Sequence, residues 1–481
     1  MLKPADLHDY QVKAYKDILR DKVFAICDRC GGGKSIICLS ACAVLKRKSP
    51  KSKMLIVCTP KGIKNAWSNE YLNWTHTKSL RVAVLNGNPK QRQKLLDGNN
   101  HDIYAISYNS LEWLVDNNKY IKFDFVFADE ADCLKGTKSK WRKWLIKASR
   151  HAKYKILASA TPKAKDEIDY WGLCKYLDNG KALDASTITE FRAMYCTHFK
   201  VGYHLMYKIR KDKIAEVERR IKHLFRNYGE KSIDEIPIKT INAMGKLSEA
   251  SKEIYKKLQD EQCVNSVVLK DGKLDTDASL PPMTLSGKLN QLSSGFLYVD
   301  DSLRIDHNTL VNATDAKQLL KDITKRQVVD VFDDRIKAIK KLVGKVRKKH
   351  NCPIAIAYTF QHELVQLQRA FPDGVSDIED DIEGRWNRDE IDTLFLQYSR
   401  SSKSLNLQKG SGHVLVKYSP TFKWVDDYQI DRRFARQGQK AECVYVYRLY
   451  IKGTIDDVKT KSLKERFIGH SRFQKQIIQE I

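Results

Sequence analysis

The stretch Val23–Ser35 reads VFAICDRCGGGKS and joins a short apolar run to a glycine-rich loop, which opens the helical pattern Ser35–Leu45. The apolar run has the β-branched and aromatic residues of a buried strand. Glycines in such a loop let backbone N–H groups face a phosphate, and a helix N-terminus favours an anion. Lys34 would reach the β- and γ-phosphates, and Ser35 would ligate Mg²⁺. Because Asp28 replaces the first glycine of the pattern GxxxxGKS/T, the segment alone leaves open a glycine-rich turn with a solvated lysine.

An acidic motif supplies the second half of such a site. The strand pattern Phe123–Ala128 runs directly into Asp129–Asp132, which reads DEAD. An aspartate at the carboxyl end of a strand, here Asp129, can hold Mg²⁺ through water, and the adjacent Glu130 can polarise an attacking water. An acidic loop after a strand is common by itself. Its combination with the glycine-rich loop in one α/β pattern predicts hydrolysis of ATP or GTP.

Strand and helix patterns alternate over the first 175 or so residues and again from about residue 336. This alternation predicts parallel sheets. We therefore expect an α/β fold with two parallel-sheet lobes, residues 1–178 and 335–481, and a largely helical insertion at 179–334. The expected strands are Val23–Cys27, Met54–Cys58, Leu80–Leu85, Ile103–Ser107, Phe123–Ala128, Lys155–Ala158, Pro353–Ala357, Thr393–Gln397, His413–Val416 and Cys443–Leu449. The expected helices include Ser35–Leu45, Ile63–Trp74, Trp141–Ser149, Lys211–Phe225, Leu247–Gln262, Ile336–Arg347 and Val425–Arg436.

The composition is strongly basic, with 86 Lys and Arg against 59 Asp and Glu among 481 residues, a net charge of +27. Such a surplus favours a polyanionic partner such as nucleic acid, although solubility charge or an anionic membrane surface would also explain it. No apolar run is long enough to span a membrane, and the first residues lack the apolar core of a signal peptide. The 11 scattered cysteines predict reduced thiols in the cytosol, and neither they nor the histidines show zinc-ligand spacing.

Several motifs of the first lobe resemble superfamily 2 helicase-like ATPases, and within them the Swi/Snf-like branch. Asp28–Ser35 is similar to that branch's D-E-M-G-x-G-K-T, which accounts for the aspartate. Leu7–Gln11, Leu55–Trp67, Ile106–Leu111 and Ser159–Pro162 resemble the other motifs of this lobe. The resemblance implies two RecA-like lobes and the following roles. The nucleotide would be bound by Gln11, Gly31, Gly32, Gly33, Lys34 and Ser35; nucleic acid would be contacted by Thr59, Pro60, Lys61, Ser107 and Tyr108; and Ser159 and Thr161 would couple the acidic motif to the second lobe.

The second lobe carries two further motifs. Ser404–Gln408 resembles motif V, which implies that Asn406 contacts nucleic acid, although Ser404 replaces the usual glycine. Tyr428–Gln439 resembles motif VI, with Gln429, Arg433, Arg436, Gly438 and Gln439 in the pattern. A phosphoryl-transfer transition state spreads charge over the γ-phosphate, and a guanidinium stabilises it. We expect Arg436 and Arg433, on one face of a helix, to supply that charge across the cleft. Gln439 is expected at the nucleotide and Gln429 in coupling.

The resemblance, which includes compact phage-type members, implies a nucleic-acid-stimulated ATPase that uses ATP and Mg²⁺ and moves on duplex or branched DNA. Ser35 and Asp129 would hold the metal. RNA as substrate, strand separation or annealing, a silent nucleic-acid-binding scaffold, and a small-molecule kinase remain alternatives. We expect a monomer in the cytosol, in a phage or bacterial host.

Overall fold

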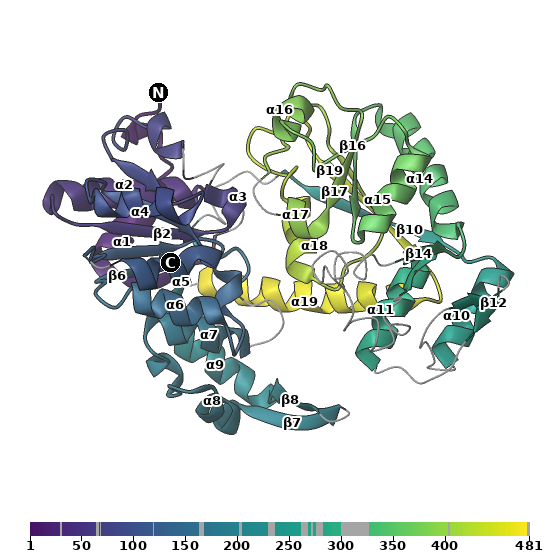
Figure 1. Ribbon diagram of the computed structural model, residues 1–481, viewed down its shortest axis with the longest axis horizontal. Coiled ribbons are helices and arrows are strands. Elements are labelled where there is room, and N and C mark those ends of the chain that lie inside the picture. Colours follow the sequence, from purple (N-terminus) through teal and green to yellow (C-terminus); the bar gives the residue numbers. More distant parts are fainter. Residues whose placement is uncertain are drawn as a thin grey trace, which may run out of the picture. The chain divides into compact units, whose positions relative to one another are not determined.

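The computed structural model describes residues 1–28, 31–63, 67, 69–118, 120–162, 168–201, 204–228, 236–260, 268–270, 273–275, 282–299, 327–402 and 405–478. The chain forms two compact units (Figure 1). Unit 1 comprises Met1–Asp234 with Arg466–Ile481, and unit 2 comprises Glu235–Glu465. Among the described helices, none is both long enough and apolar enough to cross a membrane.

A seven-stranded parallel sheet forms the centre of unit 1, in the order β3-β4-β2-β5-β6-β1-β9. Its strands are β1 (Val23–Ile26), β2 (Met54–Cys58), β3 (Val82–Val84), β4 (Ile103–Ser107), β5 (Phe125–Ala128), β6 (Tyr154–Ala158) and β9 (Phe225–Arg226). The central strands are buried on both faces, which explains their continuous apolar runs. In a parallel sheet the carboxyl ends of the strands share one edge, so the residues that follow β1, β5 and β6 come together there.

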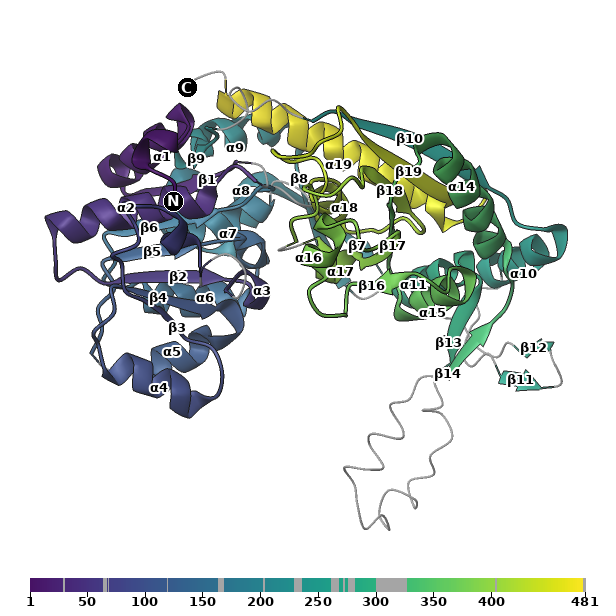
Figure 2. The same cartoon turned by 90° about the horizontal axis from the view of Figure 1, so that it is seen from above.

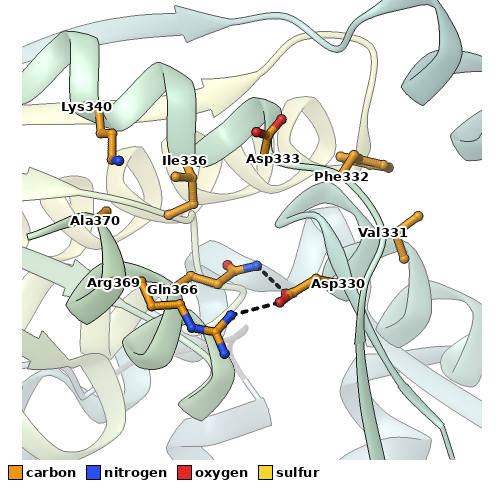
Figure 3. A pocket seen from close by; sticks show the side chains of 9 residues that line it. All are labelled: Asp330, Val331, Phe332, Asp333, Ile336, Lys340, Gln366, Arg369 and Ala370. Atoms are coloured by element: carbon orange, nitrogen blue, oxygen red, sulfur yellow. Dashed lines mark hydrogen bonds and ion pairs between the residues drawn. The ribbon is translucent and has the colours of Figure 1, made fainter.

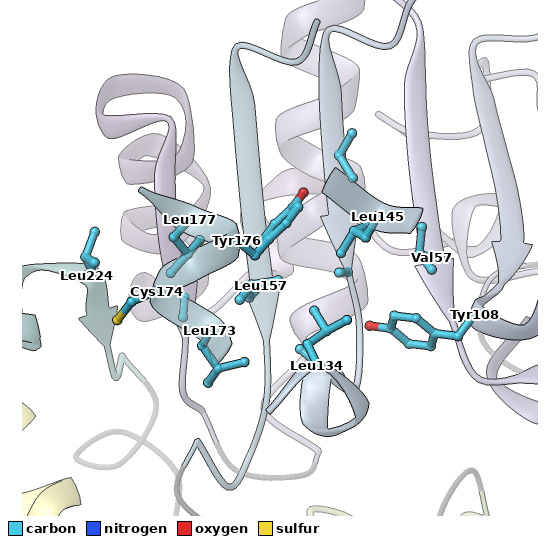
Figure 4. Close-up of a cluster of buried hydrophobic side chains, with 14 of the residues drawn as sticks. Val57, Tyr108, Leu134, Leu145, Leu157, Leu173, Cys174, Tyr176, Leu177 and Leu224 are labelled. Atoms are coloured by element: carbon cyan, nitrogen blue, oxygen red, sulfur yellow. The ribbon is translucent and has the colours of Figure 1, made fainter. Parts of the chain in front are cut away.

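Helices cover both faces of this sheet. The helices α1 (Asp9–Asp21) and α2 (Lys34–Lys48) pack on one face, and α5 (Leu111–Asn117), α6 (Lys140–Ala148) and α7 (Ile168–Leu177) on the other. Figure 4 shows part of the second layer, where Leu145 of α6 and Tyr176 of α7 surround Leu157. The remaining helices are α3 (Pro60–Gly62), α4 (Pro89–Asp97), α8 (Ile188–Tyr195) and α9 (Ile214–Ile221).

The helix expected at Ile63–Trp74 is not continuous in the residues that are described. A 3₁₀ turn spans Glu70–Asn73, and Trp74 instead pairs its backbone with Leu2. Ile63, Trp67, Tyr71 and Trp74 do have helical spacing and pack in the core, but the backbone pairing with Leu2 draws the end of the stretch out of a helix.

A buried carboxylate, Asp102, directly precedes β4 and forms ion pairs with two partly exposed cations. The side chain of Asp102 is 3% exposed and accepts hydrogen bonds from Arg81 and Lys46, with Lys46 Nζ at 2.7 Å from Oδ1. Burial raises the pKa of Asp102, but the hydrogen bonds from Arg81 and Lys46 outweigh burial and bring the pKa to about 2. These ion pairs therefore favour the folded state above that pH.

Unit 2 holds a six-stranded parallel sheet in the order β10-β19-β18-β15-β17-β16 (Figure 2). Its strands are β10 (Ile238–Gly245), β15 (Ile354–Tyr358), β16 (Val375–Ser376), β17 (Thr393–Gln397), β18 (Val414–Lys417) and β19 (Val444–Ile451). The helices are α10 (Glu249–Asp260), α11 (Pro282–Ser293), α14 (Asp334–His350), α15 (Gln361–Ala370), α16 (Ile382–Asn387), α17 (Tyr398–Ser401) and α18 (Trp424–Asp431). The last helix, α19 (Ile455–Ile478), begins in unit 2 and continues into the segment that belongs to unit 1. The two parallel sheets confirm the expected fold class.

The middle third contains more strand than the expected helical insertion. It holds the hairpins β7 (Cys196–Val201) with β8 (His204–Ile209), β11 (Val268–Lys270) with β12 (Lys273–Asp275), and β13 (Phe296–Val299) with β14 (Gln327–Asp330). Its strand β9 extends the unit 1 sheet by parallel pairing with β1, and its strand β10 extends the unit 2 sheet by parallel pairing with β19. Along the chain, the division between the units falls after Asp234 and again after Glu465, whereas the expected domain boundaries at 178 and 334 stay a prediction.

A pocket of about 350 Å³ opens in unit 2 beside α14 and α15 (Figure 3). One of its two acidic residues, Asp330, accepts hydrogen bonds from Gln366 at 3.0 Å and Arg369 at 3.2 Å. The lining residues include none of those singled out from the sequence. Its polar groups largely satisfy one another, so the pocket is a minor feature of the fold.

Candidate active site

The glycine-rich loop and the first helix meet at the carboxyl edge of the unit 1 sheet. Gly33 has φ +71° and caps α2, which begins at Lys34. A Cβ atom at Gly33 would lie 2.2 Å from Nε2 of Gln11, which is 6% exposed, so the glutamine lies directly against the loop. The hydroxyl of Tyr10 donates to the carbonyl of Gly32 at 3.2 Å. The structure thus brings Gln11 and the loop together, as expected.

Asp28 has a structural task that explains why it replaces glycine. Its carboxylate is fully buried and accepts the backbone N–H of Tyr228 at 2.6 Å, although 200 residues separate the two. The hydroxyl of Tyr228 donates to Asp17 in α1 at 2.9 Å. Nζ of Lys34 donates to the carbonyl of Asp28 at 2.8 Å. The start of the phosphate loop is therefore tied to the strand that closes the sheet.

The acidic motif follows β5 in the adjacent part of this edge. Trp67 donates its indole N–H to Oδ2 of Asp129 at 3.3 Å, and the backbone N–H of Glu130 donates to Oδ1 at 3.0 Å. Burial and the neighbouring Glu130 raise the pKa of Asp129 to about 6, although the charge of Lys34 opposes them. Glu130 has φ +50°, in the left-handed region. A carboxylate whose ionisation is so disfavoured would be stabilised by a nearby cation.

These residues fit a nucleotide with Mg²⁺. The left-handed Gly33 at the start of α2 presents backbone N–H groups, Lys34 supplies the positive charge, and the raised pKa of Asp129 matches a carboxylate built to meet a divalent cation. Ser35 lies in the first turn of α2, where a hydroxyl can join the metal's ligands. Bound Mg²⁺ would neutralise phosphate charge and align the reacting groups.

The last residue of the acidic motif connects it to the segment after β6. Oδ1 of Asp132 accepts the hydroxyl of Ser159 at 3.0 Å and that of Thr161 at 3.1 Å. Lys135, which is 4% exposed, donates to the same oxygen and to the carbonyl of Thr161. Ser159 and Thr161 therefore contact the acidic motif directly. Their expected coupling to the second lobe stays a prediction.

The residues expected at the nucleic acid differ in accessibility. Tyr108 is 5% exposed, and its hydroxyl donates to the carbonyl of Asp129 at 2.9 Å, so it supports the acidic motif from the core instead of lying at the surface. The hydroxyl of Ser107 forms a hydrogen bond with the hydroxyl of Ser110 at 3.1 Å. Thr59 caps α3 by accepting the N–H of Gly62 at 3.2 Å. Pro60 is exposed, and the side chain of Lys61 lies outside the described residues.

In unit 2 the motif VI arginines do not share a helical face. The helix α18 ends at Asp431, and the chain then turns. Arg433 is 4% exposed and donates to the carbonyls of Ser402, at 2.9 Å from Nε, and of Leu405, at 3.3 Å from Nη1. The prediction of one continuous helix was wrong because these long-range hydrogen bonds to another loop determine the path of the backbone after α18.

Arg436 and Asn406 form a second contact of this loop. Nη1 of Arg436 donates to Oδ1 of Asn406 at 2.5 Å, and Arg436 is only half-buried. Asn406 also donates to Glu383 at 3.1 Å, so its amide is engaged on both sides. Motif V, where Ser404 lies outside the described residues, is thereby held next to motif VI.

The two glutamines of motif VI are buried. Gln429 lies in α18 with no exposed surface. Nε2 of Gln439 donates to the carbonyl of Phe434 at 3.2 Å, and Gly438 before it has φ +94°. Gln439 therefore shapes the turn after Arg436, and its role at a nucleotide stays a prediction.

Sequence reasoning missed several residues of the site. Trp67 and Asp132 lie inside the motifs quoted above. The sequence therefore contained both residues, but it did not indicate that Trp67 donates a hydrogen bond to Asp129. Tyr228 carries no local signal, because its link to Asp28 is purely tertiary. Arg142 and Lys135 belong to a basic stretch, yet Arg142 turns inward to donate to the carbonyls of Leu134 and Gly136 at 2.6 and 2.7 Å.

Comparisons with known proteins identify the family of this chain. The family model for the SNF2-related domain matches residues 22–341. Protein p41 of Acyrthosiphon pisum secondary endosymbiont phage 1 is 24% identical over 459 residues, covering 92% of this chain and 91% of the relative. The DNA repair and recombination protein RAD54-like of Danio rerio is 22% identical over 490 residues, covering 89% of this chain but only 61% of the relative.

Among solved structures, the Sulfolobus solfataricus SWI2/SNF2 ATPase core in complex with dsDNA aligns with 98% of this chain and 96% of its own, at 16% identity and a TM-score of 0.43. The family match covers the phosphate loop, the acidic motif and the segment after β6, which are the parts that the sequence motifs singled out. The chain therefore belongs to the SNF2-related domain family, the Swi/Snf-like branch of the superfamily 2 helicase-like ATPases, and resembles its phage-type members.

Proposed function

We propose that this protein is a DNA-stimulated ATPase that moves along duplex or branched DNA. The observation that carries the proposal is the organised site of unit 1, where Gln11 lies against the phosphate loop and the charge of Lys34 acts on Asp129, in a chain of this family. Relatives named for DNA repair and recombination, and the net charge of +27, support DNA as the polymer.

Each side chain receives a role from its surroundings. With nucleotide and Mg²⁺ bound, Lys34 would exchange the carbonyl of Asp28 for a phosphate, Ser35 and Asp129 would hold the metal, and Glu130 would orient the attacking water. Arg436 is a better candidate than Arg433 for stabilising the charge on the γ-phosphate, because Arg436 is only half-buried and lies near the end of its loop. The guanidinium of Arg433 is committed to backbone carbonyls, so we assign it a positioning role in place of the expected phosphate contact.

The deciding experiment measures ATP hydrolysis with single-stranded DNA, duplex DNA, forked DNA and RNA, each over a salt titration. We expect the largest stimulation with duplex or forked DNA and a fall in stimulation with rising salt. Lys34→Ala is the control, and equal rates for it and the wild type would favour a silent scaffold. Turnover that no polymer stimulates would favour a small-molecule kinase.

A second assay separates movement from strand separation. Displacement of a third strand from an intact duplex reports translocation, whereas release of a duplex strand reports unwinding, and recovery of a complementary duplex reports annealing. We expect triplex displacement that depends on ATP and Lys34. Stronger activity on RNA duplexes than on DNA would favour an RNA helicase. The protein is expected to act as a monomer in the cytosol of a phage's bacterial host.

A further inference from the structure

The β7–β8 hairpin is an antiparallel ribbon that extends away from α8 and α9 within unit 1 (Figure 1). One face of the ribbon is attached to the unit. The guanidinium of Arg192 in α8 lies 4.0 Å from the ring centroid of Tyr207, Ile209 is 4% exposed, and the N–H of Arg210 donates to the carbonyl of Tyr195 at 2.9 Å. These contacts fix the base of the ribbon and its orientation.

The opposite face displays apolar side chains. Phe199 and Met206 are directly cross-strand partners, and they are 48% and 47% exposed. Because successive residues of a strand alternate between faces, Tyr207 and Leu205 belong to the attached face and Phe199 and Met206 to the other. A two-stranded ribbon has no second layer to cover such a pair. A paired aromatic and thioether at the surface indicate a binding surface.

The charge around this pair selects the partner. No Asp or Glu occurs from Tyr195 to Lys211, whereas the same stretch contains Lys200, Lys208 and Arg210. Lys208 lies two residues from Met206 and therefore on the same face. An apolar pair with Lys208 on its own face and no carboxylate in its own stretch of chain complements a partner that is anionic outside and apolar inside, which describes a nucleic acid with an accessible base.

The bases of an intact duplex are stacked, so their flat faces are accessible only where the stack is interrupted. Apolar side chains inserted at a base step, and aromatic side chains stacked on an open base, both stabilise such interruptions. We propose that the β7–β8 ribbon is a DNA-junction site, in which Phe199 and Met206 contact the open base pair at a fork or branch point while Lys208 contacts the adjacent phosphate. The inference rests on the proposed DNA function and adds a structure-selective site to it.

The test compares two substrates with the full-length protein. A dye-labelled fork has a branch point, whereas a dumbbell duplex of the same length, closed at both ends by non-nucleotide linkers, has neither a branch nor an unpaired base. We expect Phe199→Ala with Met206→Ala to weaken fork binding about tenfold. Dumbbell affinity and dumbbell-stimulated ATP hydrolysis should stay within about twofold of the wild type, because an unbranched duplex offers no open base.

Leu205→Ala is the matched control, since Leu205 is 45% exposed on the same ribbon but belongs to the attached face. It should leave fork binding unchanged, and Phe199→Tyr should retain it. A 2-aminopurine at the junction should change emission with the wild type and not with the double variant. Equal thermal unfolding of all variants would show that the ribbon still folds.

Several results would overturn the junction site. These are wild-type fork affinity in the double variant, an equal loss on fork and dumbbell, an equal loss in the Leu205→Ala control, or self-association of the wild type that the double variant abolishes while fork affinity persists. Failure of the proposed function is distinguishable, because it would appear as wild-type ATP hydrolysis that the dumbbell does not stimulate.

Discussion

Replacing Asp132 by asparagine tests the connection between the acidic motif and the segment after β6. The variant keeps the size of the side chain and an oxygen that can accept the hydroxyls of Ser159 and Thr161. It removes the charge that faces Lys135, which is 4% exposed. The expected result is a loss of stability in unit 1, because a buried ammonium group then lacks its counter-ion.

The magnitude follows from the contacts. Removing one partner of a buried ion pair costs about 3–5 kcal/mol. Lys135 retains the carbonyl of Thr161 and gains a neutral oxygen, which together return about 1 kcal/mol. We therefore expect Asp132→Asn to lower the free energy of unfolding by about 2–4 kcal/mol. Lys135→Met should cost less, since Asp132 keeps two hydroxyl donors.

Urea unfolding followed by tryptophan emission is a suitable assay. Six of the eight tryptophans lie in unit 1, so the signal reports mainly on that unit. A double-mutant cycle with Lys135→Met gives the coupling energy of the pair, expected above about 1.5 kcal/mol. A loss below about 1 kcal/mol for Asp132→Asn, or additive effects in the cycle, would refute the assigned ion pair.

Four further variants probe other parts of the structure. Gly33→Ala forces a left-handed backbone on alanine and displaces Gln11, which is expected at the nucleotide, so stability should fall by about 1–3 kcal/mol and the affinity for ATP should fall in a competition assay; unchanged affinity would contradict the contact. Arg433→Met should lower the melting temperature of unit 2 through a loss of about 2–3 kcal/mol, whereas Arg436→Met should cost under about 1 kcal/mol; equal losses would argue against the positioning role. Because the pKa of Asp102 is lowered to about 2, its contribution is complete above its ordinary pKa and fades as pH falls toward 2. Asp102→Asn should therefore cost about 1–2 kcal/mol at pH 7 and progressively less below pH 4, in urea unfolding at each pH; a constant loss would oppose this account.

The sequence predicted the central strands of both sheets because each is a short apolar run that is largely buried, whereas β9, β10 and β16 were not predicted. It also located the residues of the phosphate loop and acidic motif, whose spacing is local. Tertiary contacts determined the rest. Phe225 lay at the end of a predicted basic helix, yet it begins β9 because pairing with β1 outweighs helical propensity there.

Motif VI illustrates the same limit. The pattern Val425–Arg436 continues with helical spacing, but α18 ends at Asp431. Asp431 forms an ion pair with Lys417 at 2.8 Å, and Arg433 donates to the carbonyl of Ser402. Both partners lie well away from α18 in the sequence. A pattern read along the chain contains neither partner, so it could identify the arginines and could not assign their contacts.

The closure of the unit 1 sheet by β9 has a consequence for synthesis and for truncation. Until Tyr228 has left the ribosome, β1 is an edge strand and the buried Asp28 lacks its backbone donor. A chain cut at residue 178 would keep every motif of the first lobe and still expose that edge, which is a template for pairing with another chain. Such a fragment should aggregate, whereas a chain that continues past Tyr228 can complete the sheet. The smallest autonomous form of this ATPase lobe is therefore set by a tyrosine that belongs to no recognised motif.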